Sequence, residues 1–333
     1  MVGQTLYVAE PGAEIRRAGT RLRIDRDGQC LTRVSPQTIS QVIIFGDVFM
    51  SPNAVDLLLR ARVPVSLLTS GGRLRGRIVP PDVPSPSLRQ AQYQCASDFD
   101  YALGFAQALV RTKITGGTQL LRRHARDETR ADIEPHLSAL RKARASIRRV
   151  DTVEALRGVE GRAGAAYFDA FRELLADPAE FIKRTRRPPR DPVNALLSFG
   201  YSILGVEVAG QIAAVGLDPQ VGFLHVTRAG RPALALDLLE EFRAPVVDRV
   251  VLRCWNLRIV TSDDFISSEN GVPILRPDAR TRFLHEYESR MSKPFQHVRG
   301  FRTTYRRLVH GQARAVAHCL RYHEAYRGLP VRL

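Results

Sequence analysis

The stretch Pro80-Pro-Asp-Val-Pro-Ser-Pro86 decides how this chain is divided. Four of its seven residues are proline, which can continue neither an α-helix nor a central strand. Before it the apolar residues form alternating patterns and short runs, and after it they recur every three or four residues almost to the C-terminus. We therefore predict an α+β protein, with a small β-rich domain over residues 1–85 and a larger all-α domain over residues 86–333.

The N-terminal part is expected to consist mainly of strands. Residues 20–25 alternate between polar and apolar, and Asp27-Gly28 follows as a hairpin turn signal. Ser51-Pro52 supplies an N-cap and a proline at the first helical position. The expected elements are strands over 20–25, 41–45, 63–69 and 73–79, and a short helix from 52 to about 61.

The C-terminal part is expected to be helical. One of its segments, from about 192 to 215, is apolar all round, but Glu207 near its centre favours a buried core helix over a membrane span. The N-terminus has no signal-peptide pattern, so we expect a cytoplasmic protein without a membrane segment. Helices are predicted at about 89–125, 130–150, 151–177, 192–215, 233–242 and 299–326.

Composition excludes disordered and fibrous classes and points to an acidic partner. Hydrophobic residues make up 44% of the 333 residues and charged residues 25%, as in globular proteins. The net charge is +16, and nearly all the cations are arginine, whose planar fork suits phosphate. Nucleic acid is the favoured partner, although arginine-rich coding bias is an alternative. The four cysteines show no C-x-x-C pair, which argues against a zinc or redox site.

Glu160 interrupts the apolar stripe of the helix predicted at 151–177. The stripe contains Leu156 and Ala163 on either side of Glu160, at helical spacing. A carboxylate at such a position is costly unless a cation or hydrogen-bond donors meet it. The partner is either an arginine in an interior ion pair or a bound metal ion, and this helix alone does not decide between them.

A second acidic cluster lies in residues 234–242. Asp237, Glu240 and Glu241 are three and four residues apart and are expected to share a helical face. His225 lies twelve residues before Asp237, and the turn at 229–232 could fold it back over this helix. Carboxylates with one imidazole suit Mg²⁺ or Mn²⁺ better than zinc. A core histidine and dipole-complementing acidic residues are the alternative for each feature taken alone.

Three stretches together resemble one known family. They are Arg157-Gly-Val-Glu-Gly-Arg-Ala-Gly-Ala-Ala-Tyr-Phe168, the stretch from Pro188-Pro-Arg-Asp191 to Tyr201, and Gly222-Phe-Leu-His225 through Gly230-Arg231 to Asp237-Leu-Leu-Glu240-Glu-Phe-Arg243. This combination resembles Cas1, the CRISPR-associated integrase of spacer acquisition. The stretches at 44–46 and 71–79 also look like the N-terminal β domain of this family.

The resemblance implies a site and an activity. Glu160, His225 and Glu240 would bind Mg²⁺ or Mn²⁺, with Asp237 as a second carboxylate at the site, and these four residues would be catalytic. The activity would be that of a metal-dependent DNA endonuclease and integrase in antiviral defence, which inserts short fragments at repeat ends by transesterification. The partners implied are double-stranded DNA (prespacer and CRISPR repeat), a second copy of the chain in a homodimer, and the small subunit Cas2. The N-terminal domain would make dimer and partner contacts.

Arginines near these stretches are predicted to contact DNA phosphates without reading sequence. Arg299, Arg302 and Arg306 are expected on one face of the last helix, where a solvated charged face is an equal alternative. Asn194 is expected to hold neighbouring backbone, and Tyr201 to be packed. The DNA-binding residues predicted next to the site are Arg184, Arg186, Arg187, Arg228 and Arg231.

Two other functions stay open from the sequence. One is a basic DNA-binding scaffold without catalysis, in which the carboxylates are paired with arginine. The other is a junction-resolving or single-strand nuclease that cleaves without joining strands.

Overall fold

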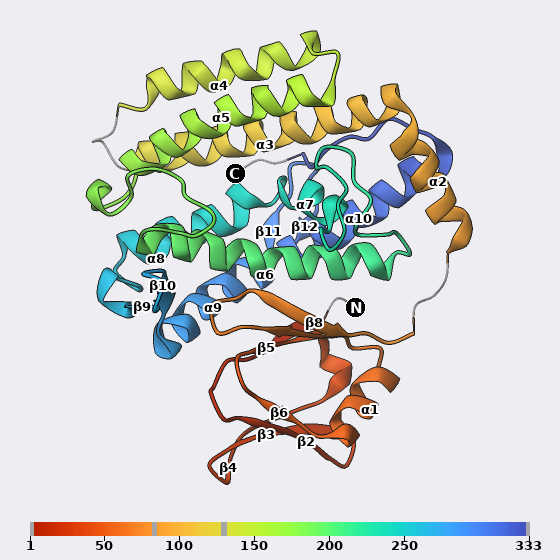
Figure 1. The fold of residues 1–333 in the computed structure, drawn as a ribbon, viewed down its shortest axis with the longest axis vertical. Helices are drawn as coiled ribbons and strands as arrows, with labels where there is room; N and C mark the ends of the chain where they lie inside the picture. The colour runs from red at the N-terminus through yellow and green to blue at the C-terminus, as the bar shows by residue number, and fades with distance from the viewer. Residues whose placement is uncertain (1–2, 82–84, 128–131, 331–333) are drawn as a thin grey trace.

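The structure is a computed structural model that describes residues 3–81, 85–127 and 132–330. A strand-rich N-terminal part lies at one end of the molecule and a helical part makes up the rest (Figure 1). The change from strand to helix falls between β8 (Leu74–Ile78) and α2 (Pro86–Ser97), where the proline-rich stretch was expected to divide the chain. Its residues 82–84 lie outside the described part. The predicted order of a β-rich and a helical part is confirmed.

Two four-stranded sheets build the N-terminal part. The turn between β3 and β4 is the predicted Asp27-Gly28 hairpin, and both residues have positive φ, as a type I′ turn requires. Ile15, Leu22 and Val42 are fully buried in the core of this part. One sheet has the order β1 (Gln4–Val8), β5 (Ile39–Phe45), β7 (Val65–Leu68), β8; the other has the order β4 (Gln29–Val34), β3 (Arg21–Arg26), β2 (Glu14–Ala18), β6 (Phe49–Met50).

The short helix α1 (Pro52–Arg60) begins as its sequence predicts. Ser51 caps it, because the Ser51 side chain accepts a hydrogen bond from the Ala54 amide at 3.2 Å, and Pro52 takes the first helical position.

Helix α6 (Pro192–Ala214) is the central helix of the molecule. It runs between β8 and the pair α3 (Phe99–Asp127) and α5 (Val153–Glu173) (Figure 1). Among the described residues it is the one helix long and apolar enough to cross a membrane, but 67% of its apolar window is buried inside the protein. The prediction of a buried core helix is therefore confirmed.

The remaining helices differ in detail from the predicted ones. The helix expected at 89–125 is two helices, α2 and α3, because Asp98 between them is extended. Residues 130–131 of the helix expected at 130–150 lie outside the described part. The helix expected at 233–242 ends at Leu239, and a π-helical segment at 243–248 follows it. The other helices are α4 (Glu134–Ser146), α7 (Ala233–Leu239), α8 (Arg249–Asn256), α9 (Pro277–Ser292) and α10 (Tyr305–Tyr322).

The helical part also contains strands that the sequence did not reveal. Two two-stranded hairpins, β9 (Phe265–Ser267) with β10 (Pro273–Leu275) and β11 (Phe295–Gln296) with β12 (Arg302–Thr303), correct the expectation of an all-α domain. The second hairpin replaces the first turn of the helix expected at 299–326, so α10 begins at Tyr305.

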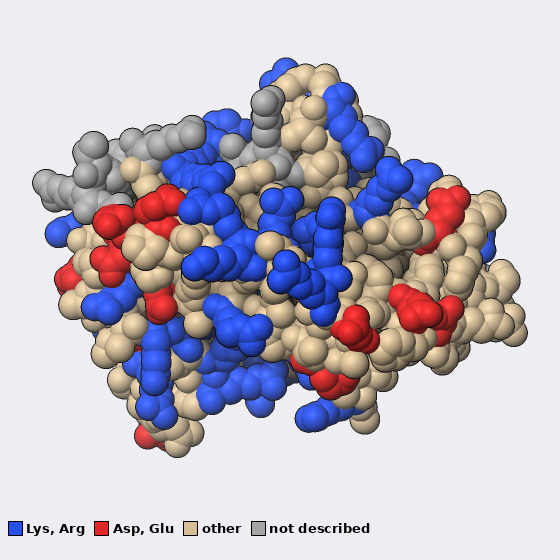
Figure 2. Space-filling model, turned by 90° about the horizontal axis from the view of Figure 1, so that it is seen from above, with Lys and Arg blue, Asp and Glu red and all other residues tan. Residues whose placement is uncertain are grey.

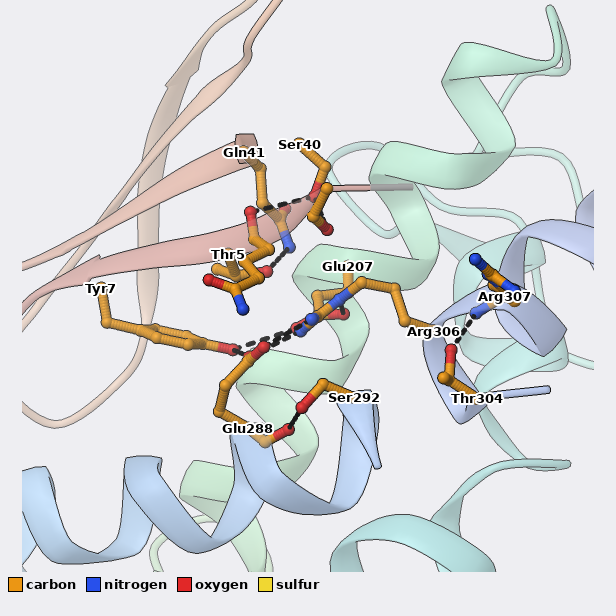
Figure 3. A network of polar contacts seen from close by, with 12 residues as sticks. Thr5, Tyr7, Ser40, Gln41, Glu207, Glu288, Ser292, Thr304, Arg306 and Arg307 are labelled. Carbon is orange, nitrogen blue, oxygen red and sulfur yellow. Dashed lines mark hydrogen bonds and ion pairs between the residues drawn. The ribbon is translucent and has the colours of Figure 1, made fainter. Parts of the chain in front are cut away.

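A buried polar network joins the two parts of the protein (Figure 3). Arg306 on α10 lies between Glu207 on α6 and Glu288 on α9, with nitrogen–oxygen distances of 3.3 and 2.6 Å. Tyr7 on β1 donates its hydroxyl to Glu207 at 3.1 Å. Burial raises the pKa of Glu207, and the positive charge of Arg306 opposes that rise.

Arg306 was expected on an exposed face, either DNA-binding or only solvated, and the expected exposure is wrong. The residue is only 5% exposed, because α10 turns this side chain toward Glu207, which is 3% exposed. Arg299 and Arg302, by contrast, are exposed on the hairpin before α10.

Arg306→Met is predicted to lower the free energy of unfolding by about 3–5 kcal/mol, because it leaves buried carboxylates without their cation. Urea unfolding followed by circular dichroism measures this loss. Arg307→Met is the matched control, since Arg307 is exposed, and should change stability by less than about 0.5 kcal/mol. Equal unfolding midpoints for the two variants would contradict a stabilising role for the network.

Candidate active site

Glu160 and Glu240 meet at a single side chain, that of Lys113. Glu160 lies on α5, Glu240 directly follows α7, and Lys113 lies on α3. The Lys113 ammonium forms an ion pair with Oε1 of Glu160 and lies 2.8 Å from Oε2 of Glu240. The structure thus brings together the two carboxylates that the sequence selected, although eighty positions separate them in the chain.

Lys113 was not predicted as a site residue from the sequence. It is one of four lysines in a chain whose cations are otherwise arginine, and it stands next to Ile114 in a largely apolar helix. A lone lysine at the edge of an apolar stripe is the signal that could have selected it.

The charge of Glu240 is strongly favoured in this environment. Its side chain is 3% exposed, and Arg243 approaches its Oε1 to 3.1 Å. Burial raises the pKa of Glu240, but the positive charges of Arg243 and Lys113 outweigh burial and hold this pKa at about 2. Glu240 is therefore an ionised ligand candidate at neutral pH.

His225 and Asp237 form a pair beside Glu240. The His225 ring nitrogen Nδ1 lies 2.7 Å from Oδ1 of Asp237, and Nε2 lies 3.9 Å from Oε1 of Glu240. In the neutral tautomer whose Nδ1 donates to Asp237, the Nε2 lone pair lies on the side of Glu240. This is the tautomer that a metal-binding or proton-accepting Nε2 needs.

Asp237 holds the loop that carries His225. Its carboxylate accepts hydrogen bonds from the backbone amides of Phe223, Leu224 and His225 at 2.6, 3.0 and 2.9 Å. Gly222 permits this close approach, because a Cβ at residue 222 would lie 2.6 Å from Oδ2 of Asp237. Both oxygens accept hydrogen bonds, and the geometry is that of a residue that orients His225. The role of Asp237 as a second carboxylate of the site, which the resemblance implied, stays a prediction.

Glu241 does not share a face with Asp237 and Glu240, so that prediction is wrong. The α-helix ends at Leu239, and the next turn aims Glu241 away from its neighbour. Its carboxylate accepts hydrogen bonds from the Tyr326 hydroxyl at 2.9 Å and from the Leu329 amide at 3.1 Å. Burial raises the pKa of Glu241 to about 7, although hydrogen bonds from Gln312, Tyr326 and Leu329 lower it.

The residues present fit a hard divalent ion. Glu160, Glu240 and the Nε2 of His225 supply two anionic oxygen donors and one nitrogen donor, a set suited to Mg²⁺ or Mn²⁺. Within the described ranges no group of three or more His, Cys, Asp and Glu side chains is already arranged around one ion position. In the structure the Lys113 ammonium stands between the two carboxylates.

The predicted arginines divide into exposed and inward-facing ones. Arg184 turns inward, because its guanidinium donates to Oδ1 of Asn194 at 2.6 Å and to Oγ of Ser198 at 3.1 Å. The expectation of a free DNA-contacting Arg184 is therefore corrected. Arg231 is partly buried, and the remaining three predicted arginines, Arg186, Arg187 and Arg228, are exposed.

Asn194 and Tyr201 behave as predicted. Asn194 accepts from the Thr185 amide and donates to the Lys183 carbonyl, both at 2.8 Å, so it holds the segment before α6. Tyr201 is packed under Arg243, whose guanidinium lies 4.6 Å from the centroid of the Tyr201 ring. The Tyr201 hydroxyl donates a hydrogen bond to Asp248.

A further basic surface covers the helical end of the molecule. Figure 2 shows Lys and Arg side chains across much of the face seen from above, which is the side of α4 in Figure 1. This surface was not predicted from the sequence. Basic residues occur along the whole chain, so the charge of a helix does not show which helices form a common surface. The exposed basic residues of α4, of the segment after it and of α5 are Arg141, Lys142, Arg144, Arg148, Arg149 and Arg162.

Known proteins share both the sequence and the fold. The family model described as "CRISPR associated protein Cas1" matches residues 6–289. CRISPR-associated endonuclease Cas1 3 of Thermus thermophilus is 36% identical over 319 residues, which cover 95% of this chain and 93% of the relative. A Cas4/Cas1 fusion of Rhodospirillum rubrum is 38% identical over 321 residues, which cover 94% of this chain and 55% of the fusion.

Two solved structures have the same fold. A casposase bound to its integration product has a TM-score of 0.85 at 25% identity, covering 98% of this chain and 93% of that one. A Cas1 protein from Thermotoga maritima has a TM-score of 0.83 at 24% identity, covering 99% of this chain and 100% of that one. The similarity to named CRISPR-associated endonucleases, together with the fold shared with a casposase, supports the class of CRISPR-associated nucleases and integrases. Within that class the chain belongs to the Cas1 family.

Glu241→Gln is predicted to make stability less dependent on pH. Because the pKa of Glu241 is raised to about 7, the folded protein keeps a proton that the unfolded chain releases at lower pH. Stability therefore falls as the pH rises from the ordinary glutamate value toward 7, by at most about 3 kcal/mol. Urea unfolding at pH 5 and pH 8 should show a smaller decrease for the variant than for the wild type.

The exposed Glu173, changed to Gln, serves as the control for this measurement and should retain the wild-type decrease. A wild-type decrease in the Glu241→Gln variant would show that other groups cause the pH dependence.

Proposed function

We propose that this protein is a metal-dependent DNA integrase and endonuclease of CRISPR adaptation, which inserts short DNA fragments as new spacers at repeat ends. The observation that carries the proposal is the meeting of Glu160, Glu240 and His225, from three separate segments, in a protein with a net charge of +16. Acidic ligands inside a basic protein suit a reaction on a phosphodiester, since the basic surface attracts the polyanion that the acidic site would otherwise repel.

Glu160, Glu240 and Nε2 of His225 would hold Mg²⁺ or Mn²⁺. When bound, the ion supplies Lewis-acid stabilisation of the negative charge that develops on the phosphate and the leaving oxygen. Glu240 carries no proton that must be removed, because the pKa of Glu240 is about 2 and its carboxylate is ionised at neutral pH. Asp237 keeps the imidazole in the tautomer that presents Nε2.

The proposed reaction exchanges one phosphodiester bond for another. The 3′-hydroxyl oxygen of the fragment forms a bond to a phosphorus atom at the repeat end, while the bond from that phosphorus to the 3′-oxygen of the repeat strand breaks. The attacking hydroxyl loses a proton and the leaving oxygen gains one. The bond count is unchanged, so the step needs no nucleotide cofactor. With water as the attacking group, the same site would act as an endonuclease.

The basic residues suit contact with duplex DNA. Arg186 lines the same cavity as Lys113 and Glu240, and Arg228 is exposed on the turn that follows His225. Contacts from these side chains to phosphates would position a duplex without reading its sequence. The structure of the casposase bound to an integration product, a protein that resembles this chain in fold, supports the same type of substrate.

The proposed partners are Cas2 and a second copy of the chain. A solved Cas6-RT-Cas1–Cas2 complex contains a chain with a TM-score of 0.83 at 26% identity, and this chain spans 36% of that longer one. We accordingly propose a homodimer that joins Cas2 and acts on prespacer DNA and the CRISPR repeat, in the cytoplasm.

A non-catalytic scaffold explains less of the structure. Its carboxylates would be neutralised by basic side chains, as Glu240 is by Arg243. A scaffold gives no reason, however, for an imidazole that Asp237 orients so that Nε2 faces Glu240.

Glu160→Gln and His225→Ala are each predicted to reduce joining at least about 100-fold, since each removes a proposed ligand of the ion that would stabilise charge at the reacting phosphate. The assay joins a duplex with free 3′-hydroxyls to a repeat-bearing plasmid, in Mg²⁺, in Mn²⁺ and in chelator. Duplex affinity, measured by gel shift, should stay within about twofold because the phosphate-binding arginines are intact. Asp169→Asn, at an exposed position of α5, the helix that carries Glu160, is the control and should join at the wild-type rate.

The outcomes separate the three functions. Wild-type joining by either variant contradicts the proposed site. Metal-dependent cleavage without joining identifies a nuclease, and tight binding without a metal requirement or any reaction identifies a scaffold.

A further inference from the structure

Lys113 is the one basic side chain in the described part of the chain that forms ion pairs with both Glu160 and Glu240. Of these two carboxylates, Arg243 contacts only that of Glu240. The Lys113 side chain is 18% exposed, Glu160 is 23% exposed and Glu240 is 3% exposed, so the three groups meet where the interior opens to solvent.

Two ionised carboxylates on separate helices repel each other when no cation stands between them. Glu160 lies within α5 and Glu240 directly follows α7, so the two carboxylates come from separate segments. In the absence of another cation, the bridging ammonium offsets the repulsion between them.

An ammonium group and a divalent ion compete for the same carboxylate oxygens. The ammonium is a donor that carries one charge and has no lone pair, so it cannot act as a ligand to the ion that replaces it. A divalent ion beside a charged ammonium is also repelled by it. Entry of the ion therefore requires the ammonium to leave Oε1 of Glu160 and Oε2 of Glu240.

The surroundings hold Arg243 more firmly than Lys113. Both side chains line the same cavity, which Gly117 and Tyr167 also border, and lysine has the more flexible, four-carbon stem. Arg243, in contrast, is stacked on the Tyr201 ring at 4.6 Å. Of the two cations next to Glu240, Lys113 is the one that can be displaced.

We propose that Lys113 is a built-in counter-cation, which holds Glu160 and Glu240 together before a divalent ion binds and is displaced when the ion enters. The inference rests on the proposed function in so far as that function requires the ion. It adds that the ion must displace the Lys113 ammonium to bind. The ammonium keeps the two carboxylates together when no ion is bound, and its displacement lowers the affinity of the site for the ion.

The test uses the full-length chain and Mn²⁺ as the probe, with affinity measured by calorimetry after removal of metal by a chelator. Lys113→Met keeps the length of the side chain and removes its charge. It should bind Mn²⁺ at least about tenfold more tightly than the wild type, since the ion no longer displaces a cation. Lys113→Arg, which keeps the charge, should not gain affinity, and Lys293→Met, at an exposed position after α9, should match the wild type.

Thermal unfolding in chelator supplies a second readout without metal. Lys113→Met should have a lower melting temperature than the wild type, and Glu160→Gln should reduce that loss, because one of the two repelling charges is then absent. Mn²⁺ should raise the melting temperature of Lys113→Met by more than that of the wild type. If Lys113→Met does not fold, the affinity of Lys113→Arg and the thermal effect of Mn²⁺ on it decide the question, and a tighter site in that variant overturns the proposal.

Failure of this inference can be told apart from failure of the proposed function. If the wild type and Lys113→Met bind Mn²⁺ equally and the wild type joins DNA only with metal, the exchange is wrong and the function stands. If the wild type binds no Mn²⁺ and joins no DNA, the proposed function and the exchange are both wrong. Weaker binding by Lys113→Met would show that Lys113 supports the ion, which also overturns the exchange.

Discussion

The arrangement of the helical part depends on the need of buried carboxylates for nearby positive charge. Glu160 and Glu240 lie on separate segments and share a partly buried position because the ammonium of Lys113 stands between them. Near the strand-rich part, Arg306 does the same for Glu207 and Glu288. Removing one partner of a buried pair leaves an uncompensated charge, which is why such clusters hold helices in one relative position even where their net contribution to stability is small.

The loops of the site are ordered by side chains that satisfy backbone amides and carbonyls. Asp237 accepts three consecutive backbone amides from residues 223–225, and Asn194 binds the backbone on both sides of Arg184. Irregular backbone near the interior must find such partners, because an unpaired buried amide costs roughly 1–3 kcal/mol. The side chains that order these loops also orient the His225 ring and the Arg184 guanidinium. The same contacts therefore order the loops and set the geometry of the site.

Much of the fold and part of the site could be predicted from the sequence. The β3–β4 turn, the cap at Ser51, and the buried helix around Glu207 follow from local rules, and each is present. The hairpins of the helical part could not be predicted, because strands of two or three residues carry too little periodicity to be recognised. Glu160 stood out since it broke an apolar stripe, whereas Lys113 breaks no stripe and was missed.

The sequence by itself determined the order of a strand-rich and a helical part, the basic character of the protein, and the types of side chain available to a site. Those properties depend on composition and on residues within a few positions of one another. Only the tertiary structure decided that Lys113 faces Glu160, that Asp237 binds the backbone of residues 223–225 while Glu241 binds Tyr326 and Leu329, and that Arg306 is buried. Partners 47 and 99 residues apart meet because helices pack, and helical spacing carries no information about which side chains then face each other.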